Sequence, residues 1–142
     1  MIRSLRPIVF AAVAAAALLA SRPAFAGPPL LCNPFDIGAA RSLPMGHRDW
    51  QAIDPAYDVS HLVDDTLALL NGQTAVMVRM ETLRRATVYA ATRPQIAAEL
   101  LKKLEDRSNA RAPLAAFDYG YLVEALREAE SVFKRPAATD VK

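Results

Sequence analysis

The chain has little cysteine and little glycine, and it lacks the short motifs that identify common enzymes. One cysteine in 142 residues cannot form a disulfide within the chain or a zinc site built from several thiolates. Five glycines and a hydrophobic fraction of 53% exclude a glycine-rich or mostly disordered chain. The sequence contains no phosphate-binding glycine loop, no GxSxG elbow, no HExxH, no CxxCH and no EF-hand loop. These absences favour a protein that is not an enzyme, and no cofactor is predicted.

The N-terminus has the three parts of a removable export signal. Arg3 and Arg6 precede an apolar run, Ile8–Ala20, and a small-x-small sequence ends at Ala26. We therefore predict a signal peptide over residues 1–26, cleaved between Ala26 and Gly27. The abundance of alanine, arginine and proline is typical of a GC-rich bacterial genome, so the predicted location is periplasmic or secreted.

Cleavage changes the charge of the chain. Removing Arg3, Arg6 and Arg22 reduces the formal net charge from +2 to −1, with 14 basic against 15 acidic residues. A nucleic-acid-binding domain is expected to keep a basic surface, so no nucleic-acid partner is predicted. The apolar run is shorter than the roughly 20 residues that span a bilayer. We therefore expect no membrane attachment after signal removal.

The first part of the mature chain, residues 27–57, combines prolines with large apolar side chains. Proline removes a backbone donor and restricts the residue before it, which disfavours a continuous helix. A solvated linker would not carry so many apolar groups. We predict an irregular, proline-rich arm (residues 27–57, "the arm") that packs on a helical body. Its prolines are Pro28, Pro29, Pro34, Pro44 and Pro55, and its large apolar residues include Leu30, Leu31, Phe35, Ile37, Leu43, Met45, Trp50 and Ile53.

Helical periodicity predicts a helical domain over residues 58–133 and a flexible tail over residues 134–142. The predicted helices span residues 58–71, 75–91, 94–107 and 113–133. Asp58 is expected to cap the first helix, and Gly72 to end it in a left-handed conformation. Pro94 and Pro113 are expected to begin the last two helices. Gly120, inside the last helix, suggests close approach by another backbone.

The helix starts recur every 17 to 19 residues. We predict an all-α fold in which four helices form two stacked antiparallel hairpins, and a closed four-helix bundle is the alternative. The spacing of the hairpins is close to the tetratricopeptide period of about 34 residues.

Two segments resemble known proteins. The stretch Phe117–Leu126, with a glycine beside aromatic residues and then leucine and alanine, resembles the first helix of a tetratricopeptide-type repeat. Together with this helix, the arm motif Cys32–Gly38 resembles exported bacterial helical proteins to which no function is attached. Helical hairpin arrays bind peptides or protein surfaces along a concave face, so the resemblance implies a role in binding a partner.

Cys32, His47 and His61 are the only cysteine and histidine residues of the mature chain. They are candidates for a mixed metal site or for a thiol-dependent centre with a histidine base. Their spacing matches no compact ligand motif, so the favoured interpretation is a free thiol and two surface histidines. Pairing of Cys32 between two chains is a further alternative.

Glu81, Arg84 and Arg85 allow two interpretations. In the first, they line a groove that holds a carboxylate, because arginine binds carboxylates in a bidentate manner. In the second, they form an exposed ladder of ion pairs. The ladder is the favoured interpretation. Tyr119 is expected to be the most exposed of three neighbouring aromatic residues. The partner-binding candidates are Phe35, Asp36, Trp50, Glu81, Arg84, Arg85 and Tyr119.

Three functions follow from these patterns. The favoured one is an exported, non-enzymatic module that binds a protein or peptide. The second is a small metal- or thiol-dependent enzyme or sensor using Cys32, His47 and His61. The third is a structural envelope protein that forms a homo-oligomer through the arm.

Native mass spectrometry of the chain purified from the periplasm, without chelator or reductant, separates these functions. The expected result is a metal-free monomer of residues 27–142, because the pattern favours cleavage before Gly27 and no metal. One bound metal per chain would instead support the enzyme or sensor. A dimer that collapses on reduction would support the structural protein.

Overall fold

The chain is all-helical in the part that its computed structural model describes, residues 29–133, which confirms the predicted fold class. Four α-helices and one 3-10 turn form there, and those residues contain no strand. The elements are η1 (Val59–His61), α2 (Leu62–Leu69), α3 (Val76–Ala90), α4 (Pro94–Asn109) and α5 (Ala115–Phe133). The predicted signal peptide, its cleavage site at Ala26 and Gly27, and the tail lie outside the described residues.

The first predicted helix is shorter than expected and ends differently. Asp58 caps η1, as predicted, by accepting a hydrogen bond from the backbone of Ser60. The expected left-handed end at Gly72 is wrong, because Gly38 is the only glycine with a positive φ in residues 29–133. A side chain from α4 closes this helix end instead. Arg107 donates to the carbonyls of Leu67 and Leu70.

The last helix differs from the expectation in two respects, its first residue and the surroundings of Gly120. Leu114 has a φ of 58°, in the left-handed region, so α5 begins at Ala115 and not at Pro113. A Cβ added at Gly120 would meet no atom within 4 Å outside its own helix. The expected close approach at Gly120 is therefore wrong, and the glycine faces open space.

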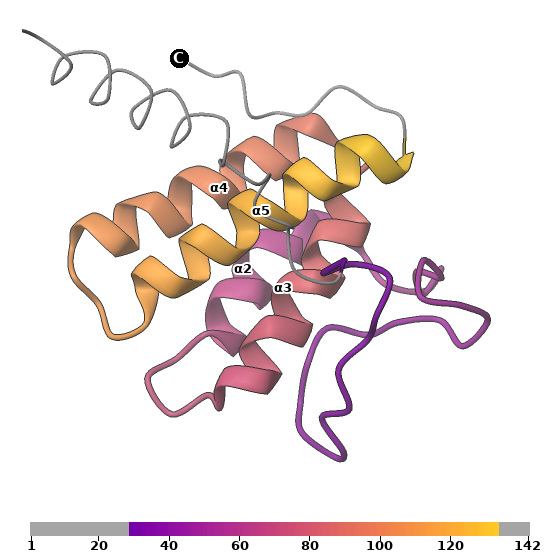
Figure 1. Ribbon diagram of the computed structural model, residues 1–142, viewed down its shortest axis with the longest axis horizontal. Helices are drawn as coiled ribbons and strands as arrows, with labels where there is room; N and C mark the ends of the chain where they lie inside the picture. Colours follow the sequence, from indigo (N-terminus) through magenta and orange to yellow (C-terminus); the bar gives the residue numbers. More distant parts are fainter. Residues whose placement is uncertain (1–28, 134–142) are drawn as a thin grey trace, which may run out of the picture.

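The helices share one apolar core. Figure 1 shows α5 beside α4 and crossing α3, and α5 packs against both of them. The shorter α2 packs against α3 and α4. The core holds side chains from every α-helix and from the arm, including Leu31, Leu43, Leu62, Leu70, Leu83, Leu100, Leu104 and Leu122.

The central helix α3 is buried on most of its surface even though it is polar. Ten of its 15 residues are buried. Five of these ten carry polar or charged side chains, which are Arg79, Glu81, Thr82, Arg84 and Thr87. Burying a polar group costs free energy unless the group is hydrogen-bonded. The sequence of α3 therefore requires partners from the elements that cover it.

One of these partners comes from α5. The Arg79 guanidinium lies 2.6 Å from an oxygen of Asp118, and both side chains are fully buried. Arg79 also donates to the carbonyl of Asn71. Burial raises the pKa of Asp118 above its ordinary range, and the neighbouring Arg79 offsets only part of this effect. The pair thus joins α3 to α5 at a high desolvation cost.

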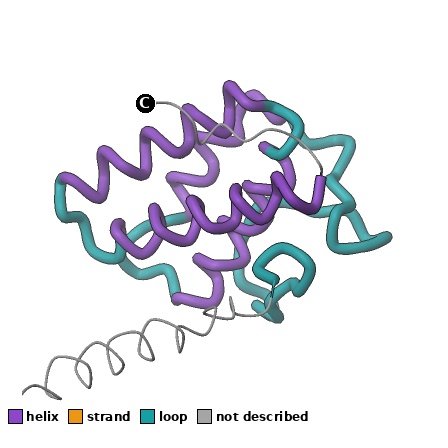
Figure 2. The backbone as a smooth tube through the Cα atoms, turned by 45° about the horizontal axis from the view of Figure 1, so that its top comes forward, coloured by secondary structure: helices purple, strands orange, loops and turns teal. Residues whose placement is uncertain are grey.

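The described part of the arm contains no helix or strand from residue 29 to residue 57. Figure 2 shows it as a continuous loop before the first helical turn. Leu31 and Leu43 are fully buried in the core, and Phe35, Met45 and Trp50 pack against it. The Trp50 and Phe133 rings are 6.0 Å apart, so the arm also contacts the end of α5.

Among the helices of residues 29–133, none combines the length and the apolar character needed to cross a bilayer.

Replacing Arg79 with methionine should lower the free energy of unfolding by about 3–5 kcal/mol, because the buried Asp118 would lose its hydrogen-bonded partner and must then keep an unpaired charge or take up a proton. The double variant Arg79→Met/Asp118→Leu should recover most of this loss, since two apolar side chains can fill the space of the pair. Urea unfolding measures both. Lys102→Met is the control, because it removes an exposed pair with Asp106 and should cost less than about 1 kcal/mol. A double variant no more stable than the single one would contradict this account.

Candidate functional site

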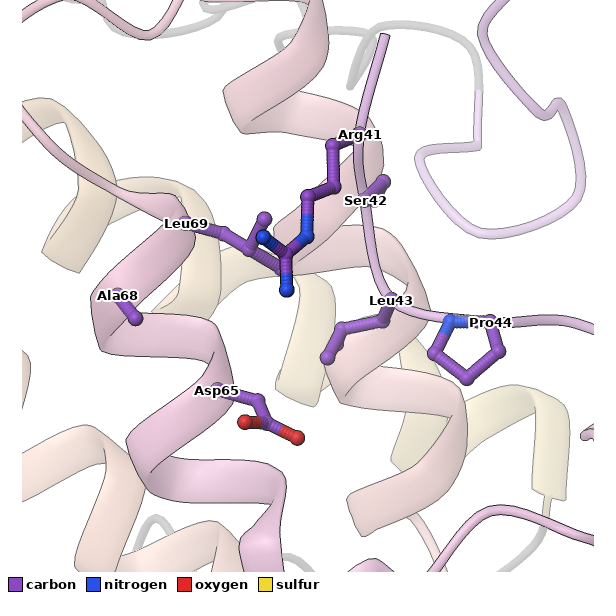
Figure 3. A pocket seen from close by; sticks show the side chains of 7 residues that line it. All are labelled: Arg41, Ser42, Leu43, Pro44, Asp65, Ala68 and Leu69. Atoms are coloured by element: carbon purple, nitrogen blue, oxygen red, sulfur yellow. The ribbon is translucent and has the colours of Figure 1, made fainter. Parts of the chain in front are cut away.

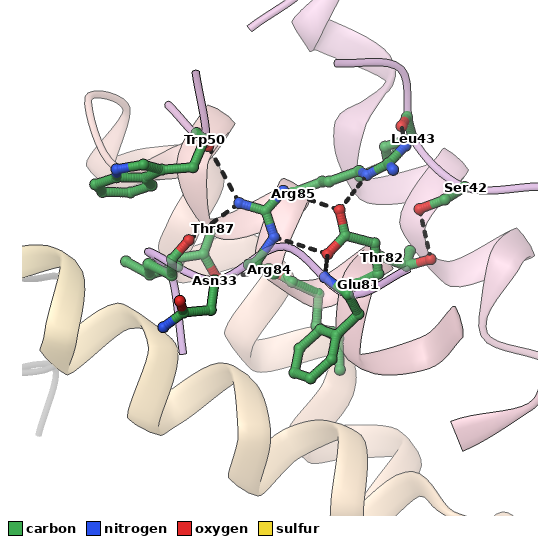
Figure 4. A network of polar contacts seen from close by, with 12 residues as sticks. Asn33, Ser42, Leu43, Trp50, Glu81, Thr82, Arg84, Arg85 and Thr87 are labelled. Atoms are coloured by element: carbon green, nitrogen blue, oxygen red, sulfur yellow. Dashed lines mark hydrogen bonds and ion pairs between the residues drawn. The ribbon is translucent and has the colours of Figure 1, made fainter. Parts of the chain in front are cut away.

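A cluster of three charged side chains lies on the face of α3 that the arm covers. Glu81 accepts hydrogen bonds from two arginines, which lie three and four residues further along the helix (Figure 4). Arg84 binds both oxygens of the carboxylate, with Nε–Oε2 and Nη2–Oε1 distances of 2.7 and 2.8 Å. Arg85 Nε lies 2.7 Å from Oε1. Glu81 and Arg84 are only 1% and 2% exposed, so they form a buried ion pair.

The same cluster binds the backbone of the arm. Glu81 accepts a hydrogen bond from the amide of Phe35, at 3.0 Å. The two guanidinium groups donate to three carbonyl groups, which belong to Leu31, Leu43 and Trp50. The arm has no ladder or helix of its own to satisfy these backbone groups, and unpaired backbone groups are costly when buried. The side chains of α3 therefore replace secondary structure for this segment.

The hydrogen bonds keep Glu81 ionised. Burial by itself would raise the pKa of this carboxyl, but the bonds from Arg84, Arg85 and the Phe35 amide outweigh it. The pKa of Glu81 is therefore lowered from its ordinary value of 4.5.

The favoured sequence interpretation of these residues, an exposed ladder of ion pairs, is wrong. The spacing of Glu81, Arg84 and Arg85 is the same in an exposed ladder and in a buried cluster, because it reflects only the helical repeat. The cluster is buried, and is not an exposed ladder, because the arm covers this face of α3.

A pocket opens at this cluster, between the arm and α3. Its volume is about 190 Å³. Its lining residues are Pro34, Met45, Gly46, His47, Asp49, Trp50, Glu81, Arg84 and Arg85. The pocket is smaller than the roughly 300–1,000 Å³ of sites for drug-sized ligands and cofactors. It is therefore suited to a small group, such as one residue of a larger partner.

Arg85 is the member of the cluster that reaches this pocket with free donors. Its side chain is 21% exposed, whereas that of Arg84 is 2% exposed. Its Nε and Nη1 atoms bind Glu81 and Leu43. Within residues 29–133, its Nη2 atom has no hydrogen-bond partner. Arg85 therefore lines the pocket with a guanidinium that the fold already positions and that has one nitrogen unused by the described residues.

A second pocket, of about 160 Å³, lies between the arm and α2. Figure 3 shows Arg41 extending from the arm towards the part of α2 that carries Asp65 and Leu69. Asp65 accepts a hydrogen bond from the hydroxyl of Tyr57, at 2.8 Å. The carboxylate of Asp65 is thus already engaged within the fold, and this pocket is the smaller of the two, so it is the weaker candidate.

The partner-binding candidates fall into two groups. Glu81, Arg84, Arg85 and Trp50 line the pocket, and Phe35 binds Glu81 through its backbone. Asp36 is exposed and caps its own turn by accepting from the amide of Gly38. Tyr119 is half-buried against the core, whereas Phe117 is exposed. The expectation that Tyr119 is the most exposed of the aromatic residues is therefore wrong.

Cys32, His47 and His61 are not gathered into a metal site. In the part of the chain from residue 29 to residue 133, no three histidine, cysteine, aspartate or glutamate side chains are placed to hold a metal ion. Cys32 is half-buried with a free thiol. His61 is exposed and lies 3.7 Å from Asp58. His47 lines the pocket described above.

Sequence reasoning missed Met45 and Asp49 as pocket residues and Glu128 as a binding site for the arm. Glu128 accepts hydrogen bonds from the amides of Leu30 and Leu31, at 2.6 and 3.2 Å. Its position carried a signal. It follows Tyr121 and Ala125 by seven and three residues, which places it on the buried face of α5.

No protein-family model matches the chain, and neither the curated proteins nor the solved structures contain a match to it.

The variant Glu81→Gln should be less stable than the parent by about 3 kcal/mol at neutral pH, because two arginines lose their buried counter-charge. The parent holds this contribution in full above pH 4.5 and loses it as the pH falls through the lowered pKa of Glu81. The two unfolding free energies should therefore approach each other as the pH falls below 4.5.

Urea unfolding between about pH 7 and about pH 3 tests this expectation. The control is Glu105→Gln, which makes the same change at an exposed position of α4. A difference between parent and Glu81→Gln that stays constant over this range would show that the ionised carboxylate is not what stabilises the arm.

Proposed function

We propose that the protein is an exported, non-enzymatic module that binds a segment of a protein or peptide at the pocket between the arm and α3. One observation carries this proposal. Arg85, which has a guanidinium nitrogen that the fold does not use, and Trp50 both line a pocket that is too small for a cofactor and large enough for one residue. Tryptophan and arginine are the residue types that most often dominate binding interfaces.

The architecture that goes with this function is two stacked antiparallel hairpins, α2–α3 and α4–α5, completed by the proline-rich arm. The contacts of α2 with α3, of α4 with α5, and of α3 with α5 support this arrangement. In repeat proteins built from such hairpins, a partner lies along a concave face. In this chain, the arm occupies part of the corresponding surface of α3, and the pocket is the part that stays open.

The arm also shows what such a surface can bind. Side chains of α3 and α5 hold the arm through its backbone amide and carbonyl groups. Backbone recognition gives affinity without demanding one particular sequence. A partner segment that continues from the pocket would be recognised by the same kind of contact.

Site-specific photo-crosslinking in the exporting cell tests the proposal. A photoreactive residue at His47, which is exposed and lines the pocket, should crosslink to one or a few discrete proteins. The same residue at Glu105, exposed on α4, should not give these products. The products from position 47 should decrease by about tenfold in an Arg85→Gln background, because the free guanidinium edge is lost.

A matched background, Arg127→Gln, removes an arginine that pairs with Glu124 on the exposed surface of α5 and should leave the products unchanged. Identical products from positions 47 and 105, or products that do not depend on Arg85, would contradict a binding role for this pocket.

A further inference from the structure

The charged cluster below the pocket has more positive than negative charge. Two guanidinium groups, Arg84 and Arg85, share one carboxylate, Glu81. Both oxygens of Glu81 already accept from these arginines. The fully buried carboxylate is therefore committed, and one positive charge of the cluster has no buried counter-charge.

The uncompensated charge is presented at a defined place. Among the guanidinium nitrogen atoms of the cluster, Nη2 of Arg85 is the one without a hydrogen-bond partner in residues 29–133, and Arg85 lines the pocket. The guanidinium is held in place by its other two nitrogen atoms, so it loses little conformational freedom when it binds a ligand. Carboxylates and phosphates are the groups that such an edge binds best.

The walls of the pocket select for an apolar group beside the anion. Pro34 and Met45, two apolar residues, line it. The volume of about 190 Å³ is below the roughly 300–1,000 Å³ of sites for drug-sized ligands. One small residue with its carboxylate fits this space, whereas a nucleotide does not.

We propose that this pocket binds a carboxylate attached to a small apolar group, with Arg85 as the anion-binding residue and Pro34 and Met45 as the apolar wall. Within the proposed binding function, on which this inference rests, the source is the C-terminal residue of a peptide or protein. A free amino acid carries the same carboxylate and is the other source that the experiment must separate.

Asp49 at the rim distinguishes the two sources. Its exposed carboxylate lines the pocket and accepts a hydrogen bond from the amide of Gln51, at 2.8 Å. It repels a ligand that carries only a carboxylate, and it attracts the ammonium group of a free amino acid. Asp49→Asn should therefore strengthen the binding of a ligand that carries only a carboxylate, and it should weaken the binding of a free amino acid. Asparagine keeps the acceptor for Gln51, so the turn is preserved.

The experiment is a titration followed by the fluorescence of Trp50, which is the only tryptophan of the chain and is one of the residues that line the pocket. N-acetyl-leucine, which has a carboxylate and no ammonium group, should give a saturable change with a dissociation constant on the order of 1 mM. N-acetyl-leucinamide, which has the same shape without the charge, should bind about tenfold more weakly or not at all.

The variants give the second part of the test. Arg85→Lys keeps a positive charge but loses the planar edge, so it should weaken the binding of N-acetyl-leucine by about tenfold. Asp49→Asn should strengthen it about twofold to tenfold. Because Arg85 also holds the arm, urea unfolding of Arg85→Lys is measured in parallel. Asp49→Asn does not alter the contact between Arg85 and the arm, so it keeps the test informative if Arg85→Lys is unstable.

Each outcome decides the proposal. Equal binding of the acid and the amide, or binding of the acid that neither variant changes, overturns it. Free leucine that binds more tightly than N-acetyl-leucine, and loses this advantage in Asp49→Asn, supports the carboxylate site and assigns it to free amino acids. A partner crosslinked at position 47 without any binding of N-acetyl-leucine leaves the binding function standing and removes this inference. Binding of N-acetyl-leucine without any crosslinked partner leaves the carboxylate site standing and removes the proposed function of binding a protein.

Discussion

The charged contacts between the arm and α3 centre on one buried carboxylate. Glu81 holds Arg84 and Arg85 in fixed orientations, and these two guanidinium groups then bind the carbonyl groups of the arm. A buried arginine without its counter-charge would be too costly to keep in this place. The irregular backbone of the arm is ordered by this cluster, and with it the pocket, one wall of which the arm supplies.

The core of this protein is therefore not held by apolar packing alone. A second buried ion pair, Arg79 with Asp118, joins α3 to α5. Buried ion pairs are often no more stabilising than apolar residues of the same size. Their contribution here is to the orientation of the elements that they join. Each has few arrangements in which its groups are satisfied, so each restricts how α5 and the arm can lie on α3.

The same cluster connects stability with the proposed function. Arg84 uses its donors within the fold, whereas Arg85 uses only part of them there and presents the rest to the pocket. A side chain that is held by the fold on one edge is already oriented for a ligand on the other edge. The proposed site would therefore need no enzyme motif, because the fold itself orients the group that meets the ligand.

Local features of the sequence determined the helices. The apolar periodicity, the cap at Asp58 and the proline at the start of α4 act within a few residues of themselves, so they can be recognised without knowing the fold. The end of α2 was not determined in this way, because Arg107 from α4 closes it and makes a left-handed Gly72 unnecessary. Only long-range packing decides such an end.

The candidate site shows the same division. The sequence identified Glu81, Arg84, Arg85 and Trp50 as residues of interest, since their types and spacing suit binding. It did not determine that the first two are buried, because helical periodicity says which residues share a face and not what covers that face. The tertiary structure decided this by placing the arm over α3. Burial then made two of these charges part of the fold and left the edge of Arg85 as the group that can meet a ligand.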